Sequence, residues 1–217
     1  MKQQRGFSLV ELMVALLISS LLLLGILQLF NNTSESDRTA NALARVQEGG
    51  RVALEIIGTD ARRTGYQGCS SIANETTVGS YTFPEDALAV AANSVTFRYA
   101  STEKTGNTPE PVFSASRACD GTELYLRTVT YAQCNNGTSL CMTLNGGSAD
   151  PILDNAVIDS IFFAIPGGGT TRWVESAALS ESERDSALAM RIQLTISDPR
   201  SDVTRTFSGT YELRNRI

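Results

Sequence analysis

The stretch that decides the fold of this chain lies near its beginning, where residues Phe7 to Phe30 read FSLVELMVALLISSLLLLGILQLF. Glu11 is the one charged residue in this stretch, and the next charged residue along the chain is Glu35. A helix that rises 1.5 Å per residue needs about 20 apolar residues to cross the core of a bilayer, which is roughly 30 Å thick. The uncharged run from Leu12 to Ser34 therefore predicts a membrane-spanning helix.

The residues around the apolar run indicate its orientation and its kind. Lys2 and Arg5 precede it, so the positive-inside rule places the N-terminus in the cytoplasm and the rest of the chain outside. A secretory signal peptide has a shorter apolar core that ends at a small-x-small cleavage site, and residues 26–32 contain none. A plain membrane anchor leaves Glu11 unexplained, because a carboxylate within an apolar segment is costly and indicates a function.

Composition narrows the function of the remaining chain. With 217 residues, one main globular domain is expected. The formal net charge is −5, and no basic patch suited to a phosphate backbone is evident, so no nucleic-acid partner is predicted. The chain has no His, the commonest general base and neutral metal ligand. We therefore expect no catalytic residue, no metal and no cofactor.

Four cysteines follow the apolar segment: Cys69, Cys119, Cys134 and Cys141. An even number of cysteines beyond a membrane anchor indicates two disulfides in an oxidising compartment. Their spacing does not fit a zinc site, which usually has two close pairs. Three pairings are open. The favoured one joins Cys134 to Cys141 around the short loop 135–137, and Cys69 to Cys119.

The helix is predicted to continue beyond the membrane to about Thr64, because residues 33–63 contain good helix formers and no Pro. Small and apolar residues recur there at helical steps of three and four: Leu43, Val46, Gly50, Leu54, Ile57 and Ala61. Gly49-Gly50 is a point where the helix either bends or admits a neighbour. Gly65 is the expected stop.

Several later segments have the composition of strands: Ser94–Tyr99, Glu123–Thr130, Val157–Ile165, Ala189–Ser197 and Arg205–Leu213. Apolar and polar residues alternate along Met190–Ile196, as they do in a strand with one buried face. Ser180–Ala187 is predicted to form a short polar helical turn. These patterns predict an α+β fold, in which an antiparallel sheet covers the helix stripe.

The string from Arg5 to Leu12, RGFSLVEL, resembles the class III signal of type IV prepilins and pseudopilins. The resemblance implies that a prepilin peptidase cuts after Gly6 and methylates the new N-terminus at Phe7. Glu11 then becomes the fifth mature residue. Because an opposite charge relieves a carboxylate in lipid, we expect Glu11 to pair with the amine of Phe7 on an adjacent subunit and to set filament register.

With this resemblance the chain divides into four parts of a pilin fold. Residues 1–6 are the leader, and residues 7–32 are the transmembrane helix. Residues 33–65 are the amphipathic half of the helix. Residues 66–217 are a disulfide-bonded periplasmic β-sheet head.

Four further segments are similar to PilW-type minor pilins: Leu43–Leu54, Asp60–Cys69, Ala189–Leu194 and Leu213–Arg216. They cover the N-terminal third and the C-terminal end, and about Ser70 to Asp150 is unmatched. The resemblance implies a minor pilin in the complex that primes filament assembly near the pilus tip. Its partners would be other minor pilins, the major pilin, the prepilin peptidase, the inner membrane before assembly and, in some cases, a tip adhesin.

Two alternatives remain open. A J-class minor pseudopilin of type II secretion shares the leader, the helix and the head, although Gly65–Cys69 and the four cysteines favour the pilus. A membrane-tethered periplasmic enzyme is more remote. Its paired carboxylates would come from scattered acidic residues that are normally solvated: Asp60, Glu85, Asp86, Asp120, Glu123, Asp154 and Asp159.

Overall fold

A computed structural model describes residues 8–69, 75–104, 112–113 and 118–214. Its longest element is the helix α1 (Leu9–Arg63), which has 55 residues and is continuous through Gly49 and Gly50. The helix is followed by Gly65, whose φ of +77° is a left-handed conformation that favours glycine. The predicted continuation of the helix beyond the apolar run and its stop at Gly65 are thus confirmed.

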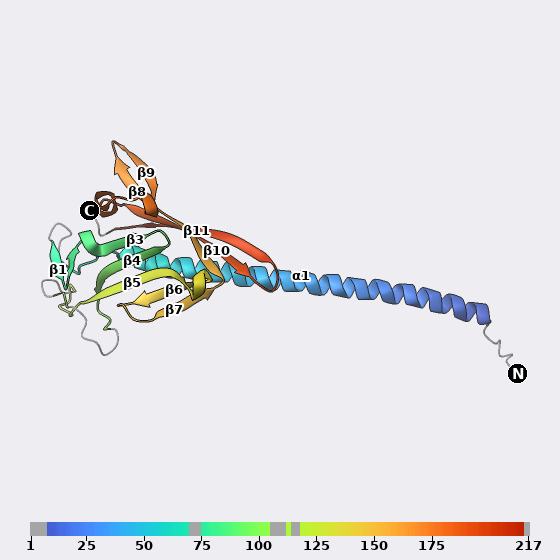
Figure 1. Cartoon of the computed structure of the whole chain (residues 1–217). Helices are drawn as coiled ribbons and strands as arrows, with labels where there is room; N and C mark the ends of the chain where they lie inside the picture. Colours follow the sequence, from blue (N-terminus) through green and yellow to red (C-terminus); the bar gives the residue numbers. More distant parts are fainter. Residues whose placement is uncertain (1–7, 70–74, 105–111, 114–117, 215–217) are drawn as a thin grey trace. The chain divides into compact units, whose positions relative to one another are not determined.

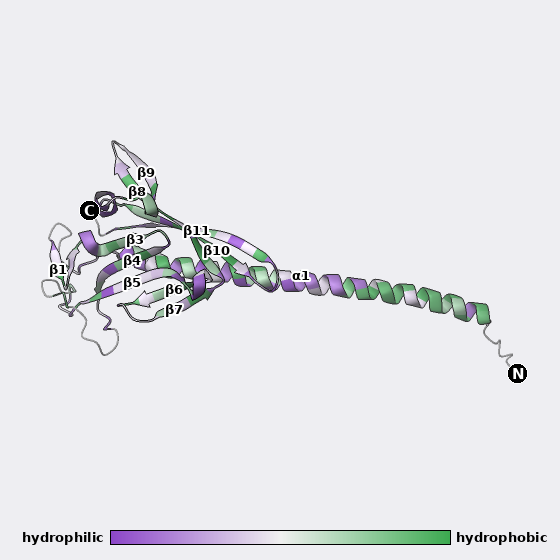
Figure 2. Ribbon diagram, in the orientation of Figure 1, coloured by the Kyte–Doolittle hydropathy of each residue, from purple (hydrophilic) through white to green (hydrophobic). Residues whose placement is uncertain are grey.

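The chain divides into two compact units, residues 1–44 and residues 45–217. The described part of the first unit is helix from Leu9 onward, and apolar residues dominate the N-terminal half of this stretch (Figure 2). By length and composition, α1 is the one helix among the described residues that could cross a membrane, with a window of mean hydropathy 2.6. This agrees with the predicted spanning segment.

The second unit contains three antiparallel sheets (Figure 1). One has five strands in the order β3-β4-β5-β6-β7: Leu88–Ala91, Ser94–Ser101, Tyr125–Cys134, Ser139–Leu144 and Ala149–Asp154. A second has four strands in the order β11-β10-β8-β9: Val203–Glu212, Ala189–Asp198, Ala156–Gly167 and Thr170–Glu175. The third is the hairpin of β1 (Thr76–Val78) and β2 (Tyr81–Phe83).

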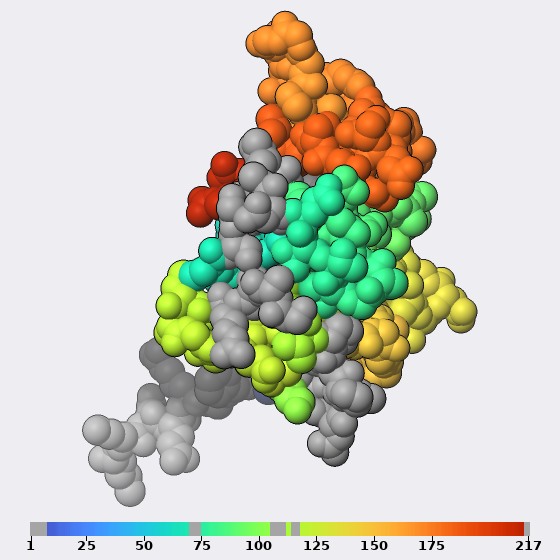
Figure 3. Space-filling model, turned by 90° about the vertical axis from the view of Figure 1, so that its left-hand side faces the viewer, coloured from blue at the N-terminus to red at the C-terminus, as the bar shows by residue number. Residues whose placement is uncertain are grey.

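Short helices complete the unit: η1 (Glu85–Ala87), η2 (Asn135–Gly137), η3 (Ser176–Ala178) and α2 (Glu181–Asp185). The helix α2 lies in the predicted polar turn and begins with a capping box, because Ser180 and Glu183 bond to each other's backbone. The hairpin of β8 and β9, in orange, stands out from the rest of the unit in Figure 3.

The five predicted strands all occur, as β4, β5, β8, β10 and β11, with ends that differ by a few residues. They lie in two sheets rather than in one, and the predicted α+β fold, with antiparallel sheet packed against the helix, is confirmed. Six further strands, most of them short, were not predicted, and pairing with them creates the separate sheets. Strands of three to six residues carry too little alternation to be read from one sequence.

The main core lies between the second half of α1 and both large sheets. In β10 the predicted alternation is confirmed, since Met190, Ile192 and Leu194 are completely buried. On α1, Ile57 and Ala61 are buried as predicted. Leu54 is only partly buried and packs on the edge of this core, whereas its neighbour Ala53 is buried.

Two glycines let β11 approach α1 closely. A Cβ added to Gly50 would lie 2.6 Å from the Phe207 ring, and one added to Gly58 would overlap the Tyr211 ring. The Tyr211 hydroxyl also donates a hydrogen bond of 2.6 Å to the Leu54 carbonyl oxygen. Of the two roles considered for the glycine pair, admitting a neighbour is therefore the one that Gly50 performs.

Both disulfides have the favoured pairing. The Cα atoms of Cys69 and Cys119 lie 5.3 Å apart, and those of Cys134 and Cys141 lie 5.9 Å apart. The second bond joins the end of β5 to β6 around η2, whose residues all have positive φ. Asn and Gly tolerate this conformation better than other residues, which explains their use in the loop.

Candidate functional site

The N-terminal site is described from Ser8 onward, so Gly6 and Phe7, the predicted cleavage and methylation residues, lie outside the described residues. Glu11 lies in the first turn of α1, where the partial positive charge of the helix end stabilises a carboxylate. Its side chain is exposed, and it forms no ion pair with any cation of the described residues. A partner for Glu11 would have to come from elsewhere.

The helix surface around Glu11 is apolar and uncovered. The large apolar side chains from Leu9 to Phe30 are between 49% and 75% exposed, Val14 being the least exposed and Leu9 the most. A surface of this extent is covered in a stable protein by lipid or by other helices. One carboxylate on an otherwise apolar helix is the arrangement expected of a segment that packs with charged partners inside a membrane or filament.

A buried cluster attaches the second half of α1 to the five-stranded sheet. The Tyr99 hydroxyl donates to Asp60 Oδ1 at 2.7 Å, and the Tyr131 hydroxyl donates to Asp60 Oδ2 at 2.5 Å. Burial is the largest effect that raises the pKa of both tyrosines, and the negative charge of Asp60 is the second. Both hydroxyls therefore remain neutral donors. Asp60 was predicted to be a solvated carboxylate; that prediction was wrong, because its oxygens face the sheet.

A second polar contact ties α1 to the four-stranded sheet. Arg45 Nη2 lies 2.6 Å from Asp198 Oδ2, at the end of β10, and the Arg200 backbone N–H donates to the other oxygen at 2.8 Å. These hydrogen bonds hold the pKa of the Asp198 carboxyl below its ordinary value, and the bond from Arg45 has the largest effect. The contact fixes the turn between β10 and β11 beside the helix.

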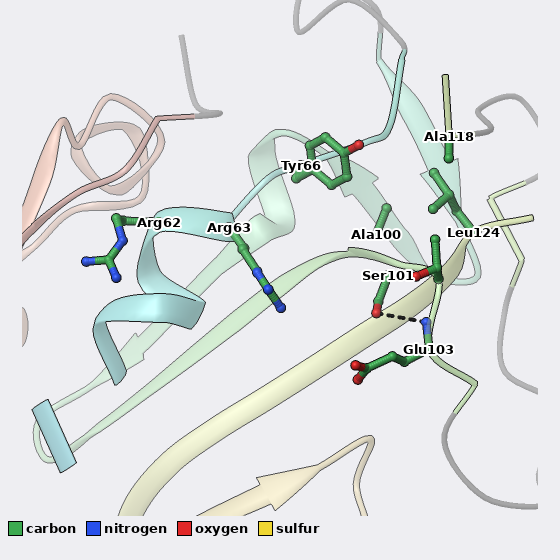
Figure 4. Close-up of a pocket in the computed structure, with 9 residues that line it drawn as sticks. Arg62, Arg63, Tyr66, Ala100, Ser101, Glu103, Ala118 and Leu124 are labelled. Carbon is green, nitrogen blue, oxygen red and sulfur yellow. Dashed lines mark hydrogen bonds between the residues drawn. The ribbon is translucent and has the colours of Figure 1, made fainter. Parts of the chain in front are cut away.

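A cavity of about 420 Å³ opens at the end of α1 (Figure 4). Its walls come from the helix end, the end of β4 and the segments beside the Cys69–Cys119 disulfide: Arg62, Arg63, Tyr66, Ala100, Ser101, Thr102, Glu103, Ala118 and Leu124. Figure 4 shows the Arg63 side chain directed toward the strand that carries Ser101, while Arg62 points to another side of the helix end. The cavity thus combines cationic, hydroxyl and apolar groups.

The acidic residues considered for catalysis do not pair with one another in the described hydrogen bonds. Five have a separate donor of their own: Asp86 binds Thr82, Asp120 binds Thr122, Glu123 binds Tyr125, Asp154 binds Ser139 and Asp159 binds Thr195. Within the described parts of the chain, no group of three or more His, Cys, Asp or Glu is placed to hold a metal ion.

The architecture defines a class: an α+β pilin-like fold, with a long N-terminal apolar helix that continues against antiparallel sheets. Residues 1–27 match the family model described as the prokaryotic N-terminal methylation motif. The chain therefore combines a prepilin-type methylation motif with a pilin-like fold, which makes it a type IV pilin-like protein of a pilus or of a secretion system. No curated protein sequence matches it.

The motif carries general consequences for the chain. It implies processing by prepilin peptidase and assembly with pilin partners, and together with the apolar helix it indicates anchoring in the inner membrane before assembly. Proteins of this kind are generally non-catalytic.

The polar contacts that join α1 to the two large sheets were not predicted. Asp60 is 39 residues from Tyr99 and 71 from Tyr131, and Arg45 is 153 residues from Asp198. No local pattern connects residues at such separations. One feature of the sequence could have indicated the role of Asp60. This residue lies three residues after Ile57, so on a helix it is on nearly the same face as the apolar stripe.

Proposed function

We propose that this chain is a minor pilin of the type IV pilus, of the PilW type, which helps to prime filament assembly and lies near the pilus tip. The observation that carries the proposal is the exposed apolar stretch Leu9–Phe30, in which Glu11 is the one carboxylate and most of which lies within the methylation motif. The resemblance of residues 43–54 and 60–69 to PilW-type minor pilins supports the finer assignment. In this proposal residues 66–217 are periplasmic until assembly, and the pilus then carries them at the cell surface.

Assembly would begin with cleavage after Gly6, which frees the amine of Phe7 for methylation. The charge of that amine and the carboxylate of Glu11 would meet between adjacent subunits. A charge in an apolar environment is unfavourable unless it is paired, so subunits out of register would be disfavoured by the unpaired Glu11. The apolar surface of Leu9–Phe30 would then pack against neighbouring helices in the filament core.

The substitution Glu11→Ala tests this mechanism in the native bacterium. We expect leader cleavage to continue, as judged by the mobility of the mature chain, and the amount of the chain in sheared filaments to fall by about tenfold or more, since an ion pair in low dielectric is lost. Glu35→Ala, beyond the apolar run, is the matched control and should leave incorporation unchanged. Normal incorporation of the Glu11→Ala chain would show that Glu11 does not set register.

A J-class minor pseudopilin of type II secretion is the second candidate, because the methylation motif and the pilin-like fold suit both systems. Deletion of the gene separates the two. A minor pilin is required for surface filaments, whereas a pseudopilin is required for release of secreted enzymes. Loss of secretion with normal filaments would replace the proposed function by this alternative.

A further inference from the structure

The cavity at the end of α1 has a charge opposite to that of the chain. Its lining contains two cationic residues, of which Arg63 is directed toward the strand that carries Ser101 and Arg62 points to another side, whereas the chain as a whole has a net charge of −5. Glu103 is the one carboxylate in the described lining, and its charge is already paired with Arg127 at 2.8 Å. Arg63 forms no ion pair with a described carboxylate and lies 6.0 Å from the centre of the Tyr99 ring.

The remaining walls are partly apolar and firmly held. Leu124 and Ala118 line one side, and Tyr66, which lines another, is 37% exposed. The Cys69–Cys119 disulfide joins the two segments that carry Tyr66 and Ala118. A covalent link between two segments that line the cavity restricts their relative movement before anything binds, which reduces the entropy lost on binding.

We propose that this cavity binds an acidic peptide segment of a different pilin-like subunit in the same assembly. An Asp or Glu carboxylate of that segment would accept hydrogen bonds from the Arg63 guanidinium, whose planar donors match a carboxylate. An adjacent apolar side chain would pack on Tyr66 and Leu124. About 420 Å³ is within the size of pockets that hold small groups, and it suffices for a few side chains.

The proposal rests on the proposed function only in requiring a pilin-like partner, which either a pilus or a secretion system would supply.

Photo-crosslinking of the full-length chain in its native cells tests the proposal. The probe is p-benzoylphenylalanine in place of Tyr66, and the crosslinked peptide is identified by mass spectrometry. We expect a peptide from another pilin-like subunit with an Asp or Glu near the crosslink. Arg63→Glu should lower the yield by about tenfold or more, because it replaces attraction by repulsion.

Controls separate charge from folding. Arg205→Glu, on the exposed surface of β11, should leave the yield unchanged. Arg63→Gln removes the charge and leaves a shorter polar side chain, and it should give an intermediate loss. All variants should form both disulfides and accumulate like the parent chain. Replacing the partner's acidic residue by Arg should restore the crosslink to the Arg63→Glu chain.

The proposal is overturned if position 66 gives no crosslink, if the yield does not respond to Arg63→Glu, or if the captured molecule is a lipid, a second copy of this chain or a segment without an acidic residue. Its failure is distinct from that of the proposed function. A crosslink to a secretion pseudopilin would support the cavity and contradict the minor-pilin assignment. Normal incorporation of the Glu11→Ala chain would leave the cavity result unaffected.

Discussion

At the scale of single residues, Asp60 holds the helix to the sheet. Its two carboxylate oxygens accept hydrogen bonds from Tyr99 and Tyr131, which come from neighbouring strands of the five-stranded sheet. Both tyrosines are almost completely buried, so their hydroxyls have no water to replace Asp60. A buried donor without an acceptor loses its full hydration, which makes this cluster sensitive to small changes.

Asp60→Asn is expected to lower the free energy of unfolding by roughly 1–3 kcal/mol, because one tyrosine hydroxyl would then face an amide N–H instead of an acceptor. Denaturant unfolding of the full chain in detergent, followed by circular dichroism, measures the change. Tyr131→Phe, which removes the donor as well, should partly offset the loss in the double variant. Unchanged stability of Asp60→Asn would mean that the carboxylate is not needed for this contact.

The same cluster predicts a dependence of stability on alkaline pH. The pKa values of Tyr99 and Tyr131 are raised by burial and then by Asp60, and burial raises the pKa of Tyr211 to about 12. An unfolded chain ionises its tyrosines near pH ~10. Above that pH the unfolded state binds fewer protons than the folded state, so the free energy of unfolding falls as pH rises.

Tyr131→Phe should make this fall shallower, although Tyr99 and Tyr211 still contribute to it. The test compares denaturation midpoints of the two chains at a series of values from about pH 8 to about pH 11, around the ordinary tyrosine pKa. Parallel curves for parent and variant would contradict the prediction. Below the ordinary tyrosine pKa, both chains should show no change that comes from these groups.

At the scale of elements, the close packing of α1 against β11 depends on two glycines in the helix. Gly50 faces Phe207, and Gly58 faces Tyr211. Glycine lowers helix stability by about 1 kcal/mol relative to Ala, so two glycines in the packed half of a helix are a sign of close approach by another element. The strand and the helix are in direct contact where the two aromatic rings lie over the glycines.

Gly58→Ala is expected to destabilise the second unit by about 1–2 kcal/mol, since overpacking a close contact costs more than the gain in helix propensity. Thermal or denaturant unfolding measures it. Gly25→Ala is the matched control, because a Cβ there meets nothing within 4 Å. Stabilisation by Gly58→Ala would show that the Tyr211 ring can move away without loss.

The sequence predicts those features that depend on residues close together along the chain. The helix, its stop at Gly65 and the alternation in β10 come from local patterns, and all three are confirmed. The separation into sheets, the Asp60 cluster and the cavity at Arg63 arise from contacts between distant residues. The motif at Glu11 is local, so it was recognised; the cavity belongs to the tertiary arrangement, so it was not.

At the scale of the whole molecule, two covalent links of very different span constrain the chain. Cys69 and Cys119 are 50 residues apart, and Cys134 and Cys141 are 7 residues apart. In the chain-entropy model a disulfide stabilises by restricting the unfolded state, and the effect grows with loop length. The longer link also joins two segments that line the cavity.

Replacing Cys69 and Cys119 by Ser should therefore lower the free energy of unfolding by about 4 kcal/mol, against about 2 kcal/mol for Cys134 and Cys141. Denaturant unfolding of the two double variants under oxidising conditions measures both values. The comparison between variants is more informative than either value alone. A larger loss from the short loop would show that native contacts around η2, rather than loop entropy, dominate.

The place of β11 in the chain has a consequence for how the molecule is made. A nascent chain emerges with its N-terminus first. The helix surface at Gly50 and Gly58 is then available long before residues 203–212, which supply Phe207 and Tyr211, have been synthesised. During that interval this strip of helix is without its final cover. Because β11 covers this strip of α1, a premature stop before Val203 would leave the strip exposed to chaperones and proteases.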